Sequence, residues 1–130
     1  MIRIMTGPSV HRRAGTWWAV VGLLGGCHPD RPQALVPGGD PNRGKAAIVT
    51  YGCGACHDIP GIRQAHGLVG PPLMHFARRS YIAGEVPNTV PSLLQWISAP
   101  QSIEPGTAMP DLGVSAQEAR DIAAYLYTLR

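Results

Sequence analysis

The clearest hydrophobic pattern in the chain lies in its last sixteen residues, where apolar positions recur at helical spacing. These positions are Ile122, Tyr125, Leu126 and Leu129. Steps of three and four residues put side chains on one face of an α-helix. Upstream, Ser115 and Glu118 have the S-x-x-E spacing of a capping box, in which each side chain satisfies a backbone N–H group. The pattern predicts a helix over residues 115–129.

A second helical signal begins at Asp40-Pro41. An aspartate can cap a helix N-terminus, and a proline fits the first turn, where its missing N–H group has no partner to lose. A short apolar face follows, formed by Ala47, Ile48 and Tyr51. Gly52 suits the position after the last helical residue. We predict a helix over residues 41–51.

The middle of the chain has weaker patterns. A helix is expected to begin near Pro91 and to stop around Pro100; its apolar face would be Leu93, Trp96 and Ile97. A short helix is expected over residues 72–83, with Gly84 past its end. No segment alternates apolar and polar residues as a strand does. The pattern therefore predicts a small all-α domain of three to four helices.

The N-terminal segment has the organisation of an export signal. The basic residues His11, Arg12 and Arg13 precede an apolar stretch over 14–26, which is well short of the ~20 residues that a membrane-spanning helix needs. Residues 1–26 are therefore predicted to be a signal peptide, which is removed from the mature protein.

The end of this segment, Leu24-Gly25-Gly26-Cys27, resembles the lipobox of bacterial lipoproteins. In those proteins the cysteine is acylated and becomes the first residue of the mature chain, so Cys27 is the predicted lipid attachment site. The alternative is an ordinary signal peptide that happens to end beside a cysteine. Residues 27–39 are rich in proline and glycine and are predicted to form a flexible membrane tether, which leaves residues 40–130 as one domain.

Removal of residues 1–26 changes the charge balance. The chain has eleven Lys and Arg residues, of which three lie in that segment, and eight Asp and Glu residues, none of which does. The mature chain is then formally neutral, with Lys45 as its one lysine. Nothing in this balance indicates a nucleic-acid partner.

The motif that carries chemistry is Cys53-Gly54-Ala55-Cys56-His57. In an exported protein, C-x-x-C-H is the attachment signature of a c-type haem: the two thiols form thioethers, and the histidine ligates the iron. Half of a zinc site and a thioredoxin-like dithiol also use C-x-x-C. The first alternative lacks a nearby second ligand pair, because the remaining cysteine is Cys27, and the second lacks a βαβ context.

A six-coordinate iron needs a second axial ligand, and Met109 has the most suitable setting. It lies in a loop stiffened by Pro105, Gly106 and Pro110, without the periodicity of a helix that would use it as ordinary core. Four other residues compete for this role: His28, His66, His75 and Met74. Each of them also has an ordinary explanation as a linker, surface or packing residue.

Over residues 40–130 the chain resembles the class I, His/Met-ligated cytochromes c. Gly70-Pro71-Pro72-Leu73 matches the G-P-x-L segment of that family, and residues 94–100 followed by 105–109 are similar to its helix and methionine loop. The resemblance implies the small cytochrome c fold around one covalent haem c, bound through Cys53 and Cys56. His57 and Met109 would be the iron ligands.

The resemblance also implies roles for residues around the haem. The Pro71 carbonyl would accept a hydrogen bond from His57, Trp96 would replace a tyrosine beside the methionine sulfur, and Arg79 would approach a haem propionate. Two departures from the family pattern are visible. Gly44 is one residue farther from Cys53 than the helix-crossing glycine of many members, and a shortened segment before Pro91 leaves Tyr81 or Asn88 as further propionate candidates.

The expected function is that of a one-electron carrier in a bacterial respiratory chain, with no substrate bond made or broken. Its partners would be donor and acceptor redox complexes, and it would lie on the periplasmic side of a membrane, anchored through Cys27. Two alternatives stay open. One is a fixed haem c subunit of a membrane oxidoreductase complex, and the other is a haem sensor or peroxidase-like protein whose Met109 does not hold the iron.

Overall fold

A computed structural model describes residues 36–130 of the chain. The signal peptide predicted over 1–26, Cys27 and His28 lie outside this range. The elements, in chain order, are α1 (Pro41–Thr50), the 3-10 turns η1 (Cys53–Ala55) and η2 (Phe76–Arg78), the strands β1 (Tyr81–Ile82) and β2 (Val86–Pro87), α2 (Val90–Ser98), the 3-10 turn η3 (Pro100–Ser102) and α3 (Ala116–Leu126). Within the described range, no helix has the length and apolar character required to cross a membrane.

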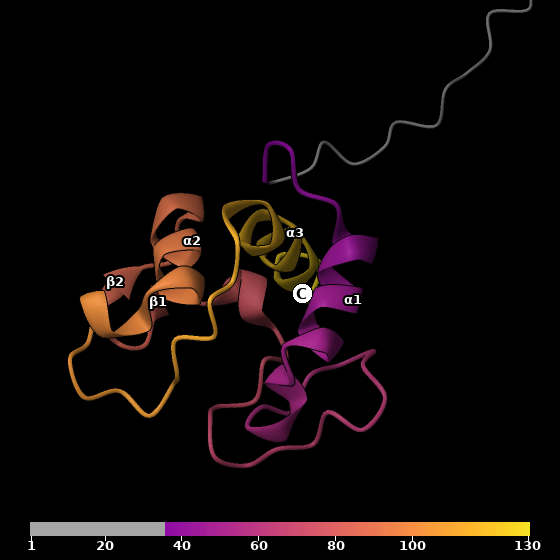
Figure 1. The fold of residues 1–130 in the computed structure, drawn as a ribbon, viewed down its shortest axis with the longest axis horizontal. Helices are drawn as coiled ribbons and strands as arrows, with labels where there is room; N and C mark the ends of the chain where they lie inside the picture. The colour runs from indigo at the N-terminus through magenta and orange to yellow at the C-terminus, as the bar shows by residue number, and fades with distance from the viewer. Residues whose placement is uncertain (1–35) are drawn as a thin grey trace, which may run out of the picture.

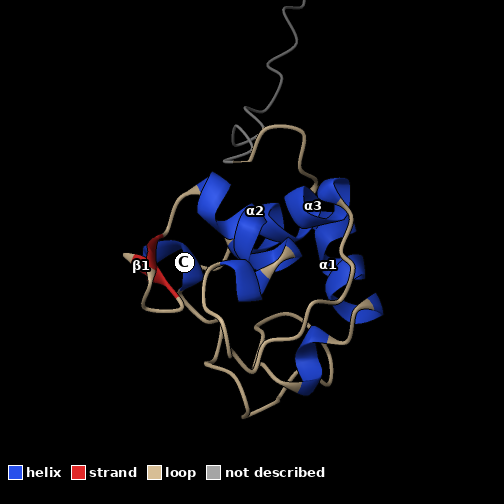
Figure 2. Ribbon diagram, turned by 60° about the vertical axis from the view of Figure 1, so that its left-hand side comes forward, coloured by secondary structure: helices blue, strands red, loops and turns tan. Residues whose placement is uncertain are grey.

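The three helices form one layer of the molecule, with α3 between α1 and α2 (Figure 1). Figure 2 shows that the long loops between the helices lie mostly on one side of this layer, below the helices in that view. The fold is therefore the helical one that the sequence predicts, with irregular loops making up much of the rest.

Helices α1 and α3 cross in close contact at Gly44. A Cβ atom at this position would lie 2.9 Å from the Ile122 backbone nitrogen, and closer still to the carbonyl of Asp121. Only glycine permits the two backbones to approach this far. Gly44 is thus the residue at which the two helices cross, although it lies one residue farther from Cys53 than the crossing glycine of many cytochromes c.

The predicted helix starts are confirmed for α1 and α3, whereas α3 ends at Leu126, before the end predicted at residue 129. The Asp40 carboxylate accepts from the backbone N–H of Asn42 at 2.8 Å and of Arg43 at 3.2 Å. Ser115 and Glu118 form the capping box, with each side chain accepting from the other residue's backbone N–H group. Gly52 ends the first helical segment with a φ of +68°. These contacts are local in sequence, so the sequence could predict them.

The helix predicted over residues 72–83 is wrong. The structure has only the 3-10 turn η2 there, followed by a β1–β2 hairpin in which Tyr81 pairs with Pro87 and Ile82 with Val86. His75 lies in the left-handed region, with a φ of +54°, which blocks helix formation from its N-terminal side. The Asn88 side-chain amide donates to the carbonyls of Phe76 and Arg79 at 3.0 Å each. The Phe76 carbonyl also accepts from the Arg79 N–H at 3.1 Å, which is the bond of a 3-10 turn and not of an α-helix.

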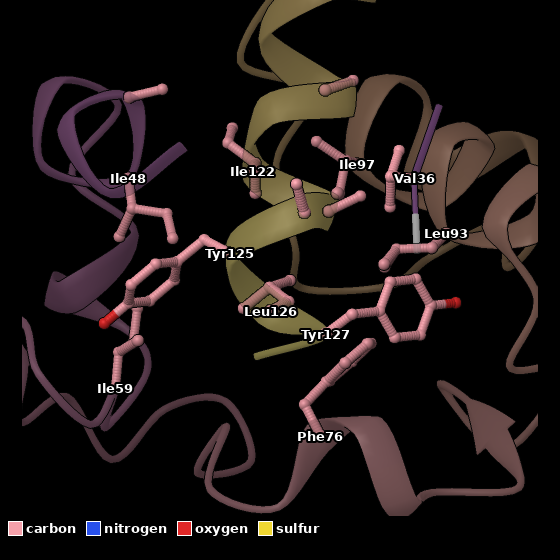
Figure 3. Close-up of a cluster of buried hydrophobic side chains, with 14 of the residues drawn as sticks. Val36, Ile48, Ile59, Phe76, Leu93, Ile97, Ile122, Tyr125, Leu126 and Tyr127 are labelled. Atoms are coloured by element: carbon pink, nitrogen blue, oxygen red, sulfur yellow. The ribbon is translucent and has the colours of Figure 1, made fainter. Parts of the chain in front are cut away.

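The apolar core joins the three helices to the connecting loops (Figure 3). Tyr125 of α3 lies beside Ile48 of α1 and Ile59, and its hydroxyl donates to the Pro60 carbonyl at 2.6 Å. On the other side of α3, the rings of Tyr127 and Phe76 meet edge to face with centroids 5.9 Å apart. The last helix therefore anchors both loop regions that flank the motif.

The described chain begins in a packed segment. Val36 is fully buried, the Gln117 side chain donates to the Gly38 carbonyl at 2.8 Å, and the Asp40 N–H donates to the Asp121 carboxylate at 2.8 Å. Residues 36–39, which the sequence analysis assigns to the tether, thus pack against α3. The packed domain begins before the boundary expected at residue 40.

Candidate functional site

A cavity of about 710 Å³ lies between α1, α2, α3 and the loops. Its walls are mostly apolar and include Ile48, Leu93 and Leu126. The predicted site residues that fall within the described range all line it: Cys53, Cys56, His57, Pro71, Arg79, Trp96 and Met109. The fold therefore brings together residues that are up to 56 positions apart in the sequence.

The segment with the two cysteines is held by a loop that folds back over it. The Gly67 N–H donates to the carbonyls of Gly54 at 3.1 Å and His57 at 3.3 Å, and the Gly70 N–H donates to that of Cys56 at 2.8 Å. Neither Cys53 nor Cys56 forms a disulfide, and burial raises the pKa of the Cys53 thiol above its ordinary value. Both thiols are thus fixed at one wall of the cavity.

His57 is oriented by the residues of the G-P-x-L segment. Its Nδ1 lies 2.8 Å from the Pro71 carbonyl oxygen. Because a carbonyl can only accept, Nδ1 carries the proton and Nε2 keeps its lone pair. Gly70 packs against the ring, since a Cβ atom there would lie 2.6 Å from Nδ1 and closer still to Cε1. The imidazole is therefore held in the tautomer that a metal requires at Nε2.

Met109 is held at the cavity by its backbone. The Gln101 amide donates to the Met109 carbonyl at 2.7 Å, and the Met109 N–H donates to the Thr107 hydroxyl at 3.3 Å. The side chain is half-buried and lines the cavity that His57 also lines. A thioether and an imidazole thus lie in the walls of the same cavity.

The residues that compete with Met109 and lie within the described range do not line this cavity. His66 is exposed and its Nδ1 pairs with the Asp58 carboxylate at 3.1 Å. His75 and Met74 are exposed as well. Among these candidates, the geometry favours Met109.

Arg79 is the basic side chain at the cavity wall. Its guanidinium donates to the Pro72 carbonyl and, at 3.4 Å, to that of Met74, and it lies 5.5 Å from the centre of the Phe76 ring. Burial lowers the pKa of Arg79 from its ordinary value. Tyr81 also lines the cavity. Asn88 does not, because it bonds the Phe76 and Arg79 carbonyls and accepts from the Tyr127 hydroxyl at 3.0 Å.

Sequence reasoning misses several residues of this site. Glu104 and Thr107 line the cavity, Gln101 positions the Met109 backbone, and Gly67 fits where a Cβ atom would overlap the backbone of Ala55 and Cys56. The glycines that flank Leu68 and Val69 give a weak signal of a close approach. Gln101 and Glu104 give none, since each is an ordinary polar residue in a loop.

The chemistry of the lining fits a haem. Two thiols three residues apart, an imidazole with a free Nε2, a thioether and apolar walls are the groups that a covalently bound haem with two axial ligands needs. A family model described as Cytochrome c matches residues 41–130. No curated protein matches the chain.

Proposed function

Because this chain belongs to the cytochrome c family, we propose that it is a one-electron carrier of a bacterial respiratory chain, passing electrons toward a terminal oxidase or reductase. Members of the family bind covalent haem c through paired cysteines, which here are Cys53 and Cys56, and they transfer electrons without catalysing a bond-changing reaction. The respiratory role and the identity of the partners are the proposed part.

When bound, the haem supplies an iron centre that alternates between its ferric and ferrous forms. The protein supplies position and environment. Cys53 and Cys56 hold the group covalently, His57 is oriented by the Pro71 carbonyl, and Met109 is the proposed second ligand. Apolar walls exclude water, which disfavours the net positive charge of the oxidised centre and raises the reduction potential. If His57 and Met109 both held the iron, no site would be open to a substrate.

The observation that carries the proposal is the presence of His57 and Met109 in the walls of one cavity. The ferric protein should show the long-wavelength charge-transfer band of a methionine–iron bond. Met109→Ala should lose that band, while the control Met74→Ala should keep it, because exposed Met74 does not line the cavity. A band that survives Met109→Ala would reject Met109 as the ligand and revive the sensor or peroxidase-like alternative.

We further propose that the mature protein is anchored through lipidated Cys27 on the periplasmic side of a membrane. This rests on the sequence features of residues 1–27. Mass spectrometry of the mature protein should show one haem, loss of residues 1–26 and acyl chains on Cys27. The Cys27→Ser variant should be released from membranes with its haem intact, and an N-terminus at Met1 would overturn this proposal.

A second candidate is a fixed haem subunit of a membrane oxidoreductase complex. The observation that favours it is apolar exposure beside the attachment segment, where Leu68 is 91% exposed and does not line the cavity. Such a side chain suits a lasting interface better than a brief, charge-steered encounter. Purification in mild detergent separates the two cases, since stoichiometric recovery with an oxidase or dehydrogenase would reject the mobile carrier.

A further inference from the structure

The loop that carries Met109 is linked to the helical part of the protein by one side chain. Gln101 belongs to the turn η3, directly after α2, and its Nε2 donates to the Met109 carbonyl oxygen at 2.7 Å. Within the described range, the other hydrogen bond of the Met109 backbone goes to Thr107, a residue of the same loop. Gln101 therefore makes the hydrogen bond that joins the Met109 peptide to a different element.

We propose that Gln101 is a positioning residue that holds Met109 in the cavity and sets how readily this ligand gives way to a small exogenous one, such as imidazole. The inference rests on the proposed function, because it takes Met109 as an iron ligand. It adds a control on access to the iron, exerted by a residue that does not line the cavity.

The rest of the loop gives Met109 limited support. Gly106 has a φ of +92°, and nothing lies within 4 Å of the place where its Cβ would be. The Thr107 N–H donates to the Glu104 carbonyl at 3.1 Å, which closes a turn but leaves Met109 beyond it. Loss of the Gln101 hydrogen bond would therefore let the Met109 peptide move away from η3, and the form with methionine off the iron would become more populated.

The size of this effect follows from the strength of one exposed hydrogen bond. A protein hydrogen bond contributes modestly because water replaces it, so its removal should change the population of the open form by roughly two- to fivefold. An exogenous ligand binds only the open form, and its apparent affinity rises in proportion to that population.

The test uses the haem-loaded, ferric protein titrated with imidazole, with loss of the methionine–iron band as the readout. Gln101→Leu should bind imidazole roughly two- to fivefold more tightly than the parent. The matched control is Gln95→Leu. Gln95 is also an exposed glutamine, but its amide donates to the Ser102 hydroxyl at 3.1 Å and not to the methionine loop, so this variant should titrate like the parent.

A second variant guards against a folding defect. Gln101→Asn shortens the side chain by one methylene and should shift imidazole affinity in the same direction by a smaller factor. Unchanged affinity in both Gln101 variants, or an equal shift in Gln95→Leu, would overturn the inference while leaving Met109 as a ligand. A parent that lacks the band would instead overturn the Met109 assignment, and the positioning role with it.

Discussion

At the scale of single residues, His57 is constrained on two sides. The Pro71 carbonyl accepts its Nδ1 proton at 2.8 Å, and Gly70 leaves room for the ring by having no side chain. Both contacts come from residues that directly follow one another, so one short segment fixes the ring's proton and its angle. Addition of one methyl group at Gly70 should therefore change the position of the His57 ring.

Gly70→Ala should displace the His57 ring and lengthen its hydrogen bond to Pro71. We expect a loss of about 1–3 kcal/mol in the free energy of unfolding from overpacking, together with a changed reduction potential. Denaturant unfolding and potentiometry measure the two effects. Gly113→Ala is the control, because its φ of +66° makes alanine strained, yet nothing lies within 4 Å of its Cβ position and it does not line the cavity; it should lose stability only. An unaltered potential in Gly70→Ala would contradict the orienting role.

Glu104 is a carboxylate in the wall of a largely apolar cavity. Its negative charge should stabilise the oxidised, more positive form of the bound centre, because fixed charges are weakly screened away from water. Glu104→Gln should therefore raise the reduction potential by some tens of millivolts. The control is Glu85→Gln, an exposed carboxylate that does not line the cavity. If the parent, Glu104→Gln and Glu85→Gln had equal reduction potentials, solvent would screen the Glu104 charge fully and the prediction would be wrong.

At the scale of elements, α1 and α3 are joined by a charged network around Asp121, which is only 3% exposed. Arg43 of α1 donates from Nε and Nη2 to the two carboxylate oxygens at 2.9 Å each. The Asp40 N–H and the Gln117 amide also donate to it, at 2.8 and 3.1 Å. These bonds, with that to Arg43 as the largest cause, lower the pKa of Asp121 below its ordinary value of 3.8.

The direction of this shift predicts a pH dependence of stability. A carboxyl whose pKa is lowered on folding stabilises the protein above its unfolded-state pKa, and this contribution is lost as the pH falls through the folded-state pKa. Asp121→Asn should reduce the free energy of unfolding by about 2 kcal/mol at neutral pH, and its deficit should shrink below a pH of about 4.

Denaturant unfolding of Asp121→Asn and the parent across this pH range measures the difference, with Glu85→Gln as an exposed control. A deficit that stays constant down to acidic pH would mean that shape, and not charge, makes the contribution of Asp121.

The elements also show what sequence could predict. Helices α1 and α3 begin after the N-cap residues Asp40 and Ser115, and the side chain of each cap bonds only to residues two or three positions further on. Such short-range caps can be predicted from the sequence. The segment over 72–83 fails because its outcome depends on Asn88, which lies beyond it and takes two of its carbonyls. A periodic pattern cannot reveal that competition.

The site divides in the same way. Cys53, Cys56 and His57 lie within five consecutive residues and form a motif visible in the sequence. The family resemblance supplies Pro71, Arg79, Trp96 and Met109, all of which line the cavity. Gln101 and Glu104 could not be predicted, since their roles follow from how η3 and the next loop pass the cavity.

At the scale of the whole molecule, the stability of the domain depends on its cavity. The cavity of about 710 Å³ is lined mainly by apolar side chains, and these would face water, without the hydrophobic stabilisation that burial gives, if no group filled the space. Since its walls come from all three helices, the fold as a whole depends on what fills it.

A variant that cannot attach haem should therefore not fold. The double variant Cys53→Ser, Cys56→Ser should lose its helical circular dichroism and any cooperative unfolding transition. The single variant Cys53→Ala keeps one thioether and should retain the helical signal with reduced stability. Parent-like dichroism and cooperative melting of the haem-free double variant would contradict this dependence.

The order of the elements along the chain has a consequence for how the protein is made. Ile122 and Leu126, which line the cavity, belong to α3, the last element, whereas Cys53 and Cys56 follow the first. The crossing at Gly44 also needs α3 before it can form. Both thiols are thus synthesised well before the wall that encloses them, which leaves them accessible for haem attachment while the rest of the chain emerges.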